Sequence, residues 1–599
     1  MAETMKERKD MDPQYMWDLS TLFKNDEEWN NALPELDEMI KKLPEYQGKL
    51  NNAKTIREFF DFDTHLGRKL SDFYCYASLR NCEDTRDSDA QAMEAKAYQV
   101  YTAYATAISF SEPEILSLDE DVLESIVHSD DLLPYAFNMQ KLLDQKLHVL
   151  SAKEEALLAA FTETLGAPSK ISESLQDADM TFESVTDSNG EVHELNQSNY
   201  ILLQMSEDRT LRLNAFKSFY KGFKQHINTF ASTYNACIKE AVAEAQVRHY
   251  ESSRAMSMAY EHVPGVVYDS LVDTVRKFMP EMYRYVRLRK QMLGLDELHY
   301  YDVYTPLVAG SSKSYTYEEA QQMILDAVTP LGKDYVNRVK QAYKDRWIDV
   351  YPNNGKRGGA FSSGTYDSNP YILTSFTGTL DSVSTIAHEM GHSQHTWLSN
   401  HTQTPQNADY TLFVAEVAST VNENLLVEQL LQKTTEPKER LALLNHYLEG
   451  FKGTVYRQTM FAEFERDAHA MAERGEAITA ASMNTLYKNL IKDYFGEDIV
   501  IDDEVQYEWA RIPHFYRPFY VYKYATSYCA AVALSEAILN NEEGAVKKYL
   551  EFLSMGGSAY PLDELKHAGV DFSTPEPVSR ALTKFSQILD DVEETLKKL

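Results

Sequence analysis

Apolar residues recur at spacings of three and four along most of the chain, which is the period of an amphipathic α-helix. Leu142, Leu143 and Leu147 form one such stretch. A second stretch follows Ser151, a residue type that caps helix N-termini, with Glu154 three residues later to complete a capping box. Glycine and proline, which interrupt helices, are sparse. The pattern predicts a chain that is mainly α-helical.

Two segments depart from the helical period. Residues 180–186 alternate between apolar and polar side chains, residues 187–190 read Asp-Ser-Asn-Gly, and residues 191–195 alternate again. This pattern predicts a short β-hairpin. The second segment, residues 348–376, carries several glycines and ends in the strand-like run 371–376. We expect a small sheet with glycine-rich turns there.

No internal repeat or low-complexity tract divides the chain. The helical pattern resumes after the predicted hairpin, near residue 200, without a linker rich in Pro, Gly or Ser. We therefore expect an N-terminal helical domain over residues 1–200, with the hairpin near 180–195, and a closely packed second domain over residues 201–599.

Composition and charge narrow the possible functions. The chain of 599 residues has 92 acidic against 59 basic side chains and a net charge of −33. Binding of nucleic acid needs a surplus of lysine and arginine, so we exclude it, together with docking on anionic lipid. An acidic interior would favour cationic peptides. No apolar run reaches 18 residues, so we expect no transmembrane helix and no membrane partner.

The N-terminus and the cysteines bear on the cellular compartment. Residues 1–20 lack the apolar core of a secretory signal. The four cysteines are scattered and form no CxxC pair, so they do not make a disulfide framework. A reducing compartment follows, and we predict a cytoplasmic protein. The sequence carries no sign of oligomeric state. The cysteines are Cys75, Cys82, Cys237 and Cys529.

The segment DSVSTIAHEMGHSQHTWL contains a candidate metal site, the HExxH motif of His388, Glu389 and His392. We expect Asp381 to cap a helix that begins at Ser382. Residues four apart on a helix share a face, so the two histidines present their imidazoles to one point. Glu389 can then reach a water beside the metal rather than the metal itself. The residues next to the motif are small or apolar, which argues against the alternative that its polar residues lie on a solvent-exposed helix face.

A catalytic zinc has three protein ligands, so a third is expected. A second helix is predicted from about Thr411, and Glu416 and Glu423 share one of its faces. A carboxylate among apolar residues is costly unless it is paired or bound to a metal. We predict Glu416 as the third ligand and Glu423 as a carboxylate that orients a ligand histidine. His395 lies outside the i, i+4 pair and is expected to be structural. The apolar positions that mark the buried side are Leu412, Val417, Val421, Leu425 and Leu426.

These residues resemble a known family. HEMGHSQH, followed by FVAEVAST and NENLL, is similar to the M3 metallopeptidases of the thimet oligopeptidase type. The motifs YMWDLS, GKRGGA, DSNPY and HFYRPFYVYKYATSY resemble the oligoendopeptidase F subfamily. The resemblance implies an elongated, mainly α-helical zincin-type metallopeptidase with a deep internal channel and a small β-sheet near the active site. It also implies a cytoplasmic zinc oligopeptidase that cuts short peptides internally and spares folded proteins.

The resemblance assigns roles to single residues. His388, His392 and Glu416 match the zinc ligands, and Glu389 matches the general base. The family's cluster of histidine and tyrosine, which contacts the substrate and the developing oxyanion, carries over onto His514 and a nearby tyrosine. The spacing from His514 is shorter than in the thimet branch. The chain has 39 tyrosines, so a stripe of tyrosines can also be explained by packing. The sequence therefore leaves three candidates, with the best match named first: Tyr524, Tyr522 and Tyr520.

The chemistry expected of these residues is hydrolysis of a peptide bond. Zinc lowers the pKa of a water, Glu389 takes its proton during attack on the scissile carbonyl, and the proton then passes to the leaving amine. A tyrosine hydroxyl or His514 would stabilise the oxyanion. The strand-like run 371–376 is expected to pair with an extended substrate.

Two alternatives stay open at this point. A helical zinc carboxypeptidase or aminopeptidase would use the same HExxH, although a GxMEN-type aminopeptidase motif is absent and the flanking motifs do not suit carboxypeptidases. The products formed from an end-blocked peptide separate these possibilities. The second alternative is a peptide-binding scaffold without catalysis, which would not need Glu389. A metal assay with and without chelator tests this alternative.

Overall fold

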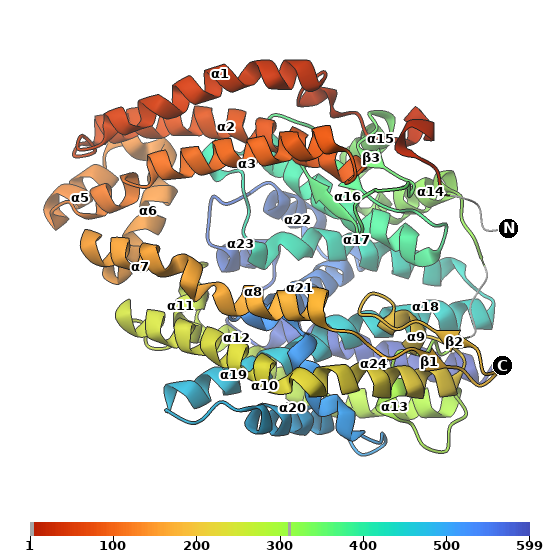
Figure 1. Ribbon diagram of the computed structural model, residues 1–599. Coiled ribbons are helices and arrows are strands. Elements are labelled where there is room, and N and C mark those ends of the chain that lie inside the picture. Colours follow the sequence, from red (N-terminus) through yellow and green to blue (C-terminus); the bar gives the residue numbers. More distant parts are fainter. Residues whose placement is uncertain (1–4, 309–312) are drawn as a thin grey trace. The chain divides into compact units, whose positions relative to one another are not determined.

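The computed structural model describes residues 5–308 and 313–599 (Figure 1). Residues 1–4, at the start of the segment that lacks a secretory signal, lie outside the described residues. The described chain is mostly helical with a few short strands, which confirms the predicted fold class. Within these two ranges, no helix combines the length and the apolar character needed to cross a bilayer.

The chain forms two compact units, each assembled from three separate stretches of sequence. The units group residues by packing, whereas the division into residues 1–200 and 201–599 follows chain order and stays a prediction. Unit 1 comprises residues 1–149, 313–429 and 534–570, and unit 2 comprises residues 150–312, 430–533 and 571–599.

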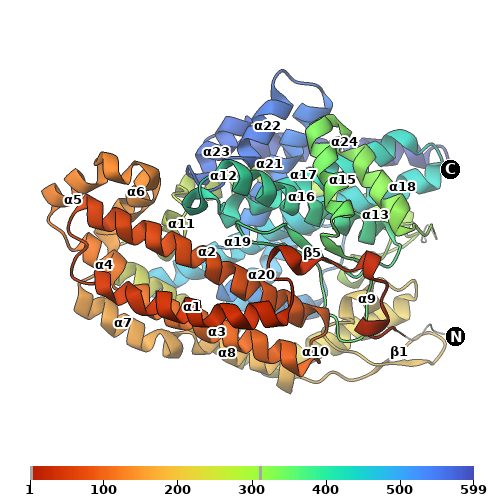
Figure 2. The same cartoon turned by 90° about the horizontal axis from the view of Figure 1, so that it is seen from above.

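Three long helices, α1, α2 and α3, lie side by side in unit 1 (Figures 1 and 2). Trp29 of α1 stacks on Phe73 of α2 with ring centroids 4.2 Å apart, and both side chains are buried. The helices of unit 1 are α1 (Asp26–Lys42), α2 (Ala53–Glu83), α3 (Ser88–Ile108), α4 (Ser111–Leu116), α5 (Glu120–Val127), α6 (Ala136–Gln145), α14 (Tyr317–Ala327), α15 (Lys333–Lys344), α16 (Leu380–Thr402), most of α17 (Leu412–Lys433), α22 (Ala545–Leu553) and α23 (Pro561–Ala568).

The predicted small sheet is present in unit 1. It consists of β3 (Ile348–Asp349), β4 (Phe361–Ser363) and β5 (Tyr371–Leu373). Strand β5 lies in the middle, parallel to β3 and antiparallel to β4. Tyr371 and Leu373 join the apolar core of the N-terminal helices, and helix α16 contacts both β4 and β5. The sheet therefore connects the N-terminal helices to the helix that carries HExxH.

Unit 2 is organised around the long helix α10, which contacts α8, α9, α11, α19 and α20. The predicted hairpin is formed by β1 and β2, in which Val185 pairs with His193 and Thr186 with Val192. The capping box at α7 is also confirmed. The elements of unit 2 are α7 (Ala152–Leu165), α8 (Ala167–Ser174), β1 (Val185–Thr186), β2 (Val192–His193), α9 (Tyr200–Gln204), α10 (Arg209–Val247), α11 (Ser253–Ala259), α12 (Gly265–Lys277), α13 (Met279–Met292), α18 (Pro437–Gly450), α19 (Arg457–Glu473), α20 (Ala480–Phe495), the first part of α21 (Tyr522–Leu539) and α24 (Glu576–Leu596).

Two local predictions need correction. Helix α16 begins at Leu380 rather than Ser382, because the Thr379 side chain caps it by accepting the Ser382 N–H at 3.2 Å. Asp381 therefore lies in the first turn, where a carboxylate favours the positive end of the helix dipole. On α17, Leu412 is 59% exposed, since it is the first residue of the helix, whereas Val417 and Val421 are fully buried as predicted.

Candidate functional site

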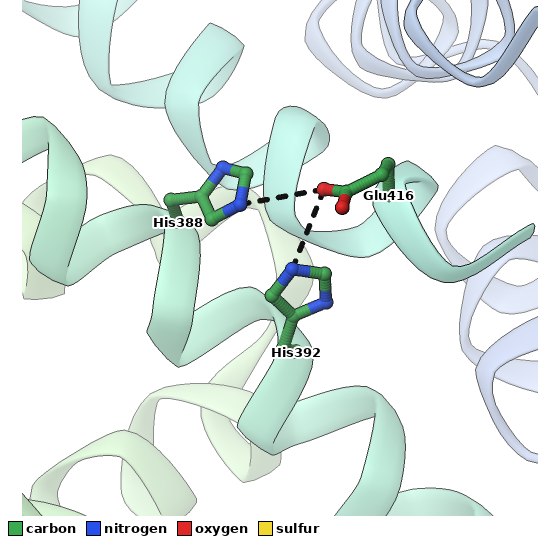
Figure 3. A group of neighbouring side chains, drawn as sticks. All are labelled: His388, His392 and Glu416. Atoms are coloured by element: carbon green, nitrogen blue, oxygen red, sulfur yellow. Dashed lines mark ion pairs between the residues drawn. The ribbon is translucent and has the colours of Figure 1, made fainter. Parts of the chain in front are cut away.

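The two histidines of HExxH lie one turn apart on α16 and point toward Glu416 of α17 (Figure 3). Glu416 Oε2 is 3.3 Å from His388 Nε2 and 3.4 Å from His392 Nε2. A single carboxylate oxygen thus faces two imidazole nitrogens, and each nitrogen carries a lone pair when its neutral imidazole has the proton on Nδ1. The structure brings together the three residues that the sequence singles out as metal ligands.

The donor set fits a divalent metal ion. Ligand atoms about 2.0–2.1 Å from a tetrahedral zinc lie about 3.3 Å from one another. The Nε2–Oε2 separations of 3.3 and 3.4 Å have this length, and the ligand atoms of the three side chains all lie within 4.8 Å of one another. Two nitrogens and one carboxylate oxygen also form a ligand set typical of catalytic zinc.

Helices α16 and α17 must approach closely to bring Glu416 to the histidines. A Cβ on Gly391 would lie 2.5 Å from the carbonyl oxygen of Ala418 and 2.6 Å from Ser419 Cα, so glycine is required where the backbones meet. Nearby, the Asn422 side chain donates to the Ala387 carbonyl at 3.1 Å and accepts from the Tyr335 hydroxyl at 3.0 Å. This buried link fixes the register of α17 against α16.

Glu423 holds one histidine in place, as predicted for a carboxylate behind a ligand. Its Oε1 lies 2.6 Å from His388 Nδ1, which leaves His388 Nε2 free to face Glu416. Burial by itself would lower the pKa of His388, but hydrogen bonds to Glu416 and Glu423 raise it well above its ordinary value. Burial likewise raises the pKa of Glu416, yet the two histidines bring it below its ordinary value. The site therefore strongly favours a positive charge between these groups.

Glu389 lies beside the metal-ligand group but does not belong to it. Its side chain is buried, with 6% exposed, and among the described residues it has no hydrogen-bond partner. Burial raises the pKa of Glu389 above its ordinary value, and the adjacent His388 and His392 oppose this shift. A carboxylate with a raised pKa is well suited to exchange protons near neutral pH.

His395 has a packing role. Its ring is 1% exposed and stacks on Tyr410 with centroids 3.7 Å apart. Burial lowers the pKa of His395 to about 3, so the imidazole is neutral. The ring lies parallel to the tyrosine ring and fills the space behind α16, which agrees with the structural role expected from the sequence.

A second group of possible ligands lies in the hairpin of unit 2. Asp187, Glu191 and His193 also place ligand atoms within 4.8 Å of one another. The Asp187 carboxylate, however, already accepts the backbone N–H groups of Asn189 at 2.9 Å and Glu191 at 2.8 Å. These are the hydrogen bonds of an Asx-type turn, so the group is explained by the local fold.

The remaining candidates, His514 and the tyrosines, belong to unit 2. His514 lies in a 3₁₀ turn, and its Nε2 is 3.4 Å from the Tyr524 hydroxyl. The ring of Tyr520 is 6.2 Å from that of His514 and 5.4 Å from that of Tyr524. Tyr522 is fully buried and packs on Tyr268 at 5.0 Å. Three of the four residues thus form one cluster, and the Tyr522 ring packs on Tyr268.

A buried acid that the sequence analysis missed supports this cluster. Glu465 of α19 is fully buried, and its carboxylate accepts the backbone N–H of Phe519 at 2.7 Å. Phe519 has φ +57°, a left-handed conformation that is strained for a bulky residue. Glu465 therefore stabilises the turn immediately before Tyr520. The sequence did contain a sign of this role, because Glu465 ends the otherwise largely apolar stretch MFAEFE.

The predicted role of residues 371–376 in substrate pairing is wrong for the strand itself. Strand β5 has β3 on one side and β4 on the other, so both of its hydrogen-bonding edges are occupied. Strand β4 is an edge strand of this sheet. Ser362 of β4 contacts Ser393 of α16 through their hydroxyls at 2.8 Å, directly after His392. The edge available beside the HExxH helix is that of β4.

The chain is similar in sequence and in structure to known proteins. The family model described as Peptidase family M3 matches residues 202–584, and the one described as Oligopeptidase F matches residues 114–182. Oligopeptidase PepF of Bacillus subtilis is 43% identical, with 100% of this chain and 90% of the relative covered. Group B oligopeptidase PepB of Streptococcus agalactiae is 40% identical, with 99% and 98% covered. The crystal structure of oligoendopeptidase-F from Enterococcus faecium has a TM-score of 0.75 at 36% identity and covers 96% of this chain and 100% of its own.

Proposed function

The chain belongs to peptidase family M3, and we propose that it is a zinc-dependent oligoendopeptidase that hydrolyses internal bonds of short peptides. The observation that carries the proposal is that one carboxylate oxygen lies 3.3 Å from one imidazole nitrogen and 3.4 Å from the other. His388, His392 and Glu416 would hold the ion. When bound, zinc supplies a Lewis acid that polarises the scissile carbonyl and makes the attacking water more acidic.

Glu389 is proposed as the general base. It is the residue next to His388 on α16, it is buried, and its raised pKa suits a group that accepts a proton and returns it. Glu389 takes a proton from the attacking water and then delivers it to the nitrogen of the leaving amine. Glu423 keeps His388 in the tautomer with its proton on Nδ1, so that Nε2 stays unprotonated.

His514 and Tyr524 are proposed to act on the substrate, with Tyr520 beside them. The proposal rests on the resemblance of the segment HFYRPFYVYKYATSY and on the contact between Tyr524 and His514. Burial lowers the pKa of His514, so it is neutral near pH 7 and can orient the tyrosine hydroxyl. A phenol O–H directed at the oxygen on which charge develops stabilises the transition state.

Replacement of Tyr524 by phenylalanine is expected to lower kcat by about 10²-fold, the usual effect of removing one oxyanion donor. The matched control is Tyr522→Phe, because Tyr522 is fully buried and packs on Tyr268. That variant is expected to retain nearly normal turnover. Steady-state kinetics on one peptide substrate measure both. Equal losses in the two variants would contradict the assignment of the oxyanion donor to Tyr524.

An extended substrate is proposed to add to the free edge of β4. Residues 361–363 present that edge beside α16, and main-chain pairing of this kind accepts many side chains. Only a substrate with an unpaired backbone can add to a strand in this way. The proposal therefore favours flexible peptides over folded proteins. The burial of Glu389 also favours flexible peptides, because a folded protein cannot bring its backbone to a buried side chain.

A cytoplasmic location is also proposed. Its support is the state of the four cysteines, which are all buried and free. Free thiols of this kind fit a reducing compartment.

The acidity of the chain, with its net charge of −33, adds a preference for peptides that carry lysine or arginine, and salt should weaken that preference.

The test of the proposed function uses a peptide of roughly 10 residues with acetylated and amidated ends, long enough to pair with an edge strand. We expect internal cleavage, loss of activity with a chelator, and recovery when zinc is returned. A stable folded protein incubated in parallel should stay intact. Cleavage only at unblocked ends would indicate an exopeptidase, and degradation of the folded protein at a comparable rate would contradict the preference for short peptides.

A further inference from the structure

Unit 2 contains an internal cavity of about 160 Å³ that the proposed reaction does not use. It lies where the helix formed by α18 and α19 is interrupted by a π-helical segment, Phe451–Tyr456. Such segments are rare and occur frequently at functional sites. A Cβ on Gly453 of this segment would meet no atom within 4 Å, which agrees with open space at the cavity wall. The charged side chains of the wall are Glu449, Lys452 and Arg457, and four tyrosines, among them Tyr304, also line it.

Positive charge exceeds negative charge around this cavity. Lys452 and Arg289 both pair with Glu449. Arg457 pairs with Glu508 at 2.7 Å, and Arg511 approaches the same carboxylate at 3.8 Å. Four cations therefore face two carboxylates, a surplus of two positive charges inside a protein whose net charge is −33.

Neighbouring carboxylates do not supply the missing charge. Asp302 is already matched by Arg209 at 2.9 Å and by Arg212 at 2.7 Å. Glu463 is matched by Arg276 at 2.8 Å and by Arg466 at 3.2 Å. The two arginines beside Glu463 also pair with Asp493 at 3.2 Å and with Asp467 at 2.8 Å, so these acids are occupied by their own cations and the surplus belongs to the cavity itself.

Two of the four cations are buried, and their charge is therefore costly. The Lys452 side chain is 7% exposed and that of Arg289 is 2% exposed. Burial, together with the nearby Arg289, lowers the pKa of Lys452 to about 8 against the attraction of Glu449. Lys452 and Arg289 share the single carboxylate of Glu449, so an anion in the cavity would give these buried cations a second partner.

Donors remain at the cavity wall for such an anion. Lys452 donates to Glu449 and to the Val303 carbonyl, which leaves one of its three N–H groups. Arg457 directs Nη1 and Nη2 to Tyr300 and Glu508, and in residues 5–308 and 313–599 its Nε has no acceptor. Across the same ranges the Tyr304 hydroxyl has no hydrogen-bond partner, and Lys452 Nζ lies 5.2 Å from its ring centre.

We propose that the cavity binds a small monovalent anion, a halide such as chloride, between Lys452, Arg457 and the Tyr304 hydroxyl. The cavity volume of about 160 Å³ accommodates a halide and a few waters but no peptide. The rest of the wall is largely apolar, which favours a weakly hydrated ion such as chloride or bromide over a strongly hydrated one such as sulfate. The bound anion neutralises half of the surplus and holds the π-helical segment between α18 and α19. Apolar wall residues include Met282, Val303, Met460 and Phe495.

The experiment uses the full chain and bromide, which can be located by anomalous scattering. Thermal unfolding is followed while sodium gluconate is replaced by sodium bromide at constant ionic strength. We expect the unfolding midpoint to rise and then saturate, and crystals soaked in bromide to show an anomalous peak beside Lys452. Equal midpoints in bromide and gluconate, without a peak in the cavity, would overturn the proposal.

Three variants assign the effect to this cavity. Lys452→Met is expected to weaken bromide binding by roughly tenfold or more, the usual effect of losing one charge-assisted hydrogen bond, while Arg289 still neutralises Glu449. Tyr304→Phe removes only a hydroxyl and is expected to weaken binding several-fold, so it tests the site even if Lys452→Met does not fold. Lys221→Met, at a half-exposed position of the same unit, is the charge-matched control and should bind bromide normally. Unchanged saturation in both Lys452→Met and Tyr304→Phe would place the anion elsewhere and overturn the proposal.

Discussion

Replacement of Glu389 by glutamine is expected to lower kcat by about 10²–10⁴-fold, the contribution typical of a general base. The amide has the shape of the carboxylate but cannot take a proton from the attacking water. Metal content should stay unchanged, because the three ligand atoms belong to His388, His392 and Glu416. Fold stability should change little, since the Glu389 side chain makes no hydrogen bond within the described part of the chain.

The matched control for this variant is Asp381→Asn on the same helix. Asp381 is exposed in the first turn of α16, so the same loss of one carboxylate charge occurs two turns before the metal-ligand group. We expect nearly normal kcat in that variant. Metal analysis, thermal unfolding and kinetics on one blocked peptide distinguish the outcomes. Normal turnover of Glu389→Gln would remove Glu389 from the role of base.

Helix α16 illustrates how much of the site could be predicted from sequence. The i, i+4 spacing fixes the relation of His388 to His392, because helical geometry is local. The position of Glu416 depends on a contact between distant segments, and a chemical argument about zinc ligands and the family resemblance pointed to it, whereas helical periodicity did not. Gly391 was visible inside the motif, but its purpose is the approach of Ala418, which no local pattern reveals.

Strand order and buried polar contacts lay beyond the sequence analysis. The apolar run 371–376 predicted a strand, and the structure contains β5 there. Its central place between β3 and β4 follows from a strand order that differs from chain order. The role of Glu465 could not be predicted for a related reason, since its hydrogen-bond partner is the N–H of Phe519, fifty-four residues later. In both cases the deciding contact is non-local, and amphipathic periodicity carries no information about it.

Removal of the Glu416 carboxylate is expected to abolish stable metal binding. Glu416→Ala leaves two histidine ligands, and zinc held by two protein ligands exchanges readily with chelator. Glu423→Gln keeps an acceptor near His388 Nδ1 but loses the charge, so metal affinity should fall by about 10–100-fold, the effect of altering a residue behind a ligand. Zinc content after dialysis against a weak chelator should therefore decrease from the unmodified protein to Glu423→Gln and then to Glu416→Ala.

The hairpin of unit 2 provides the decisive control for this order. Asp187, Glu191 and His193 are the other group of side chains in the described part of the chain that could hold a metal ion. Asp187→Ala should leave zinc content and peptide cleavage unchanged, because the Asp187 carboxylate serves the turn. If Asp187→Ala lost the metal while Glu416→Ala retained it, the metal would belong to the hairpin, and the catalytic role of HExxH would fail with it. Retention of metal and activity in both variants would instead transfer the third ligand to another carboxylate, and Glu423, 2.6 Å from His388, is the next to replace by alanine.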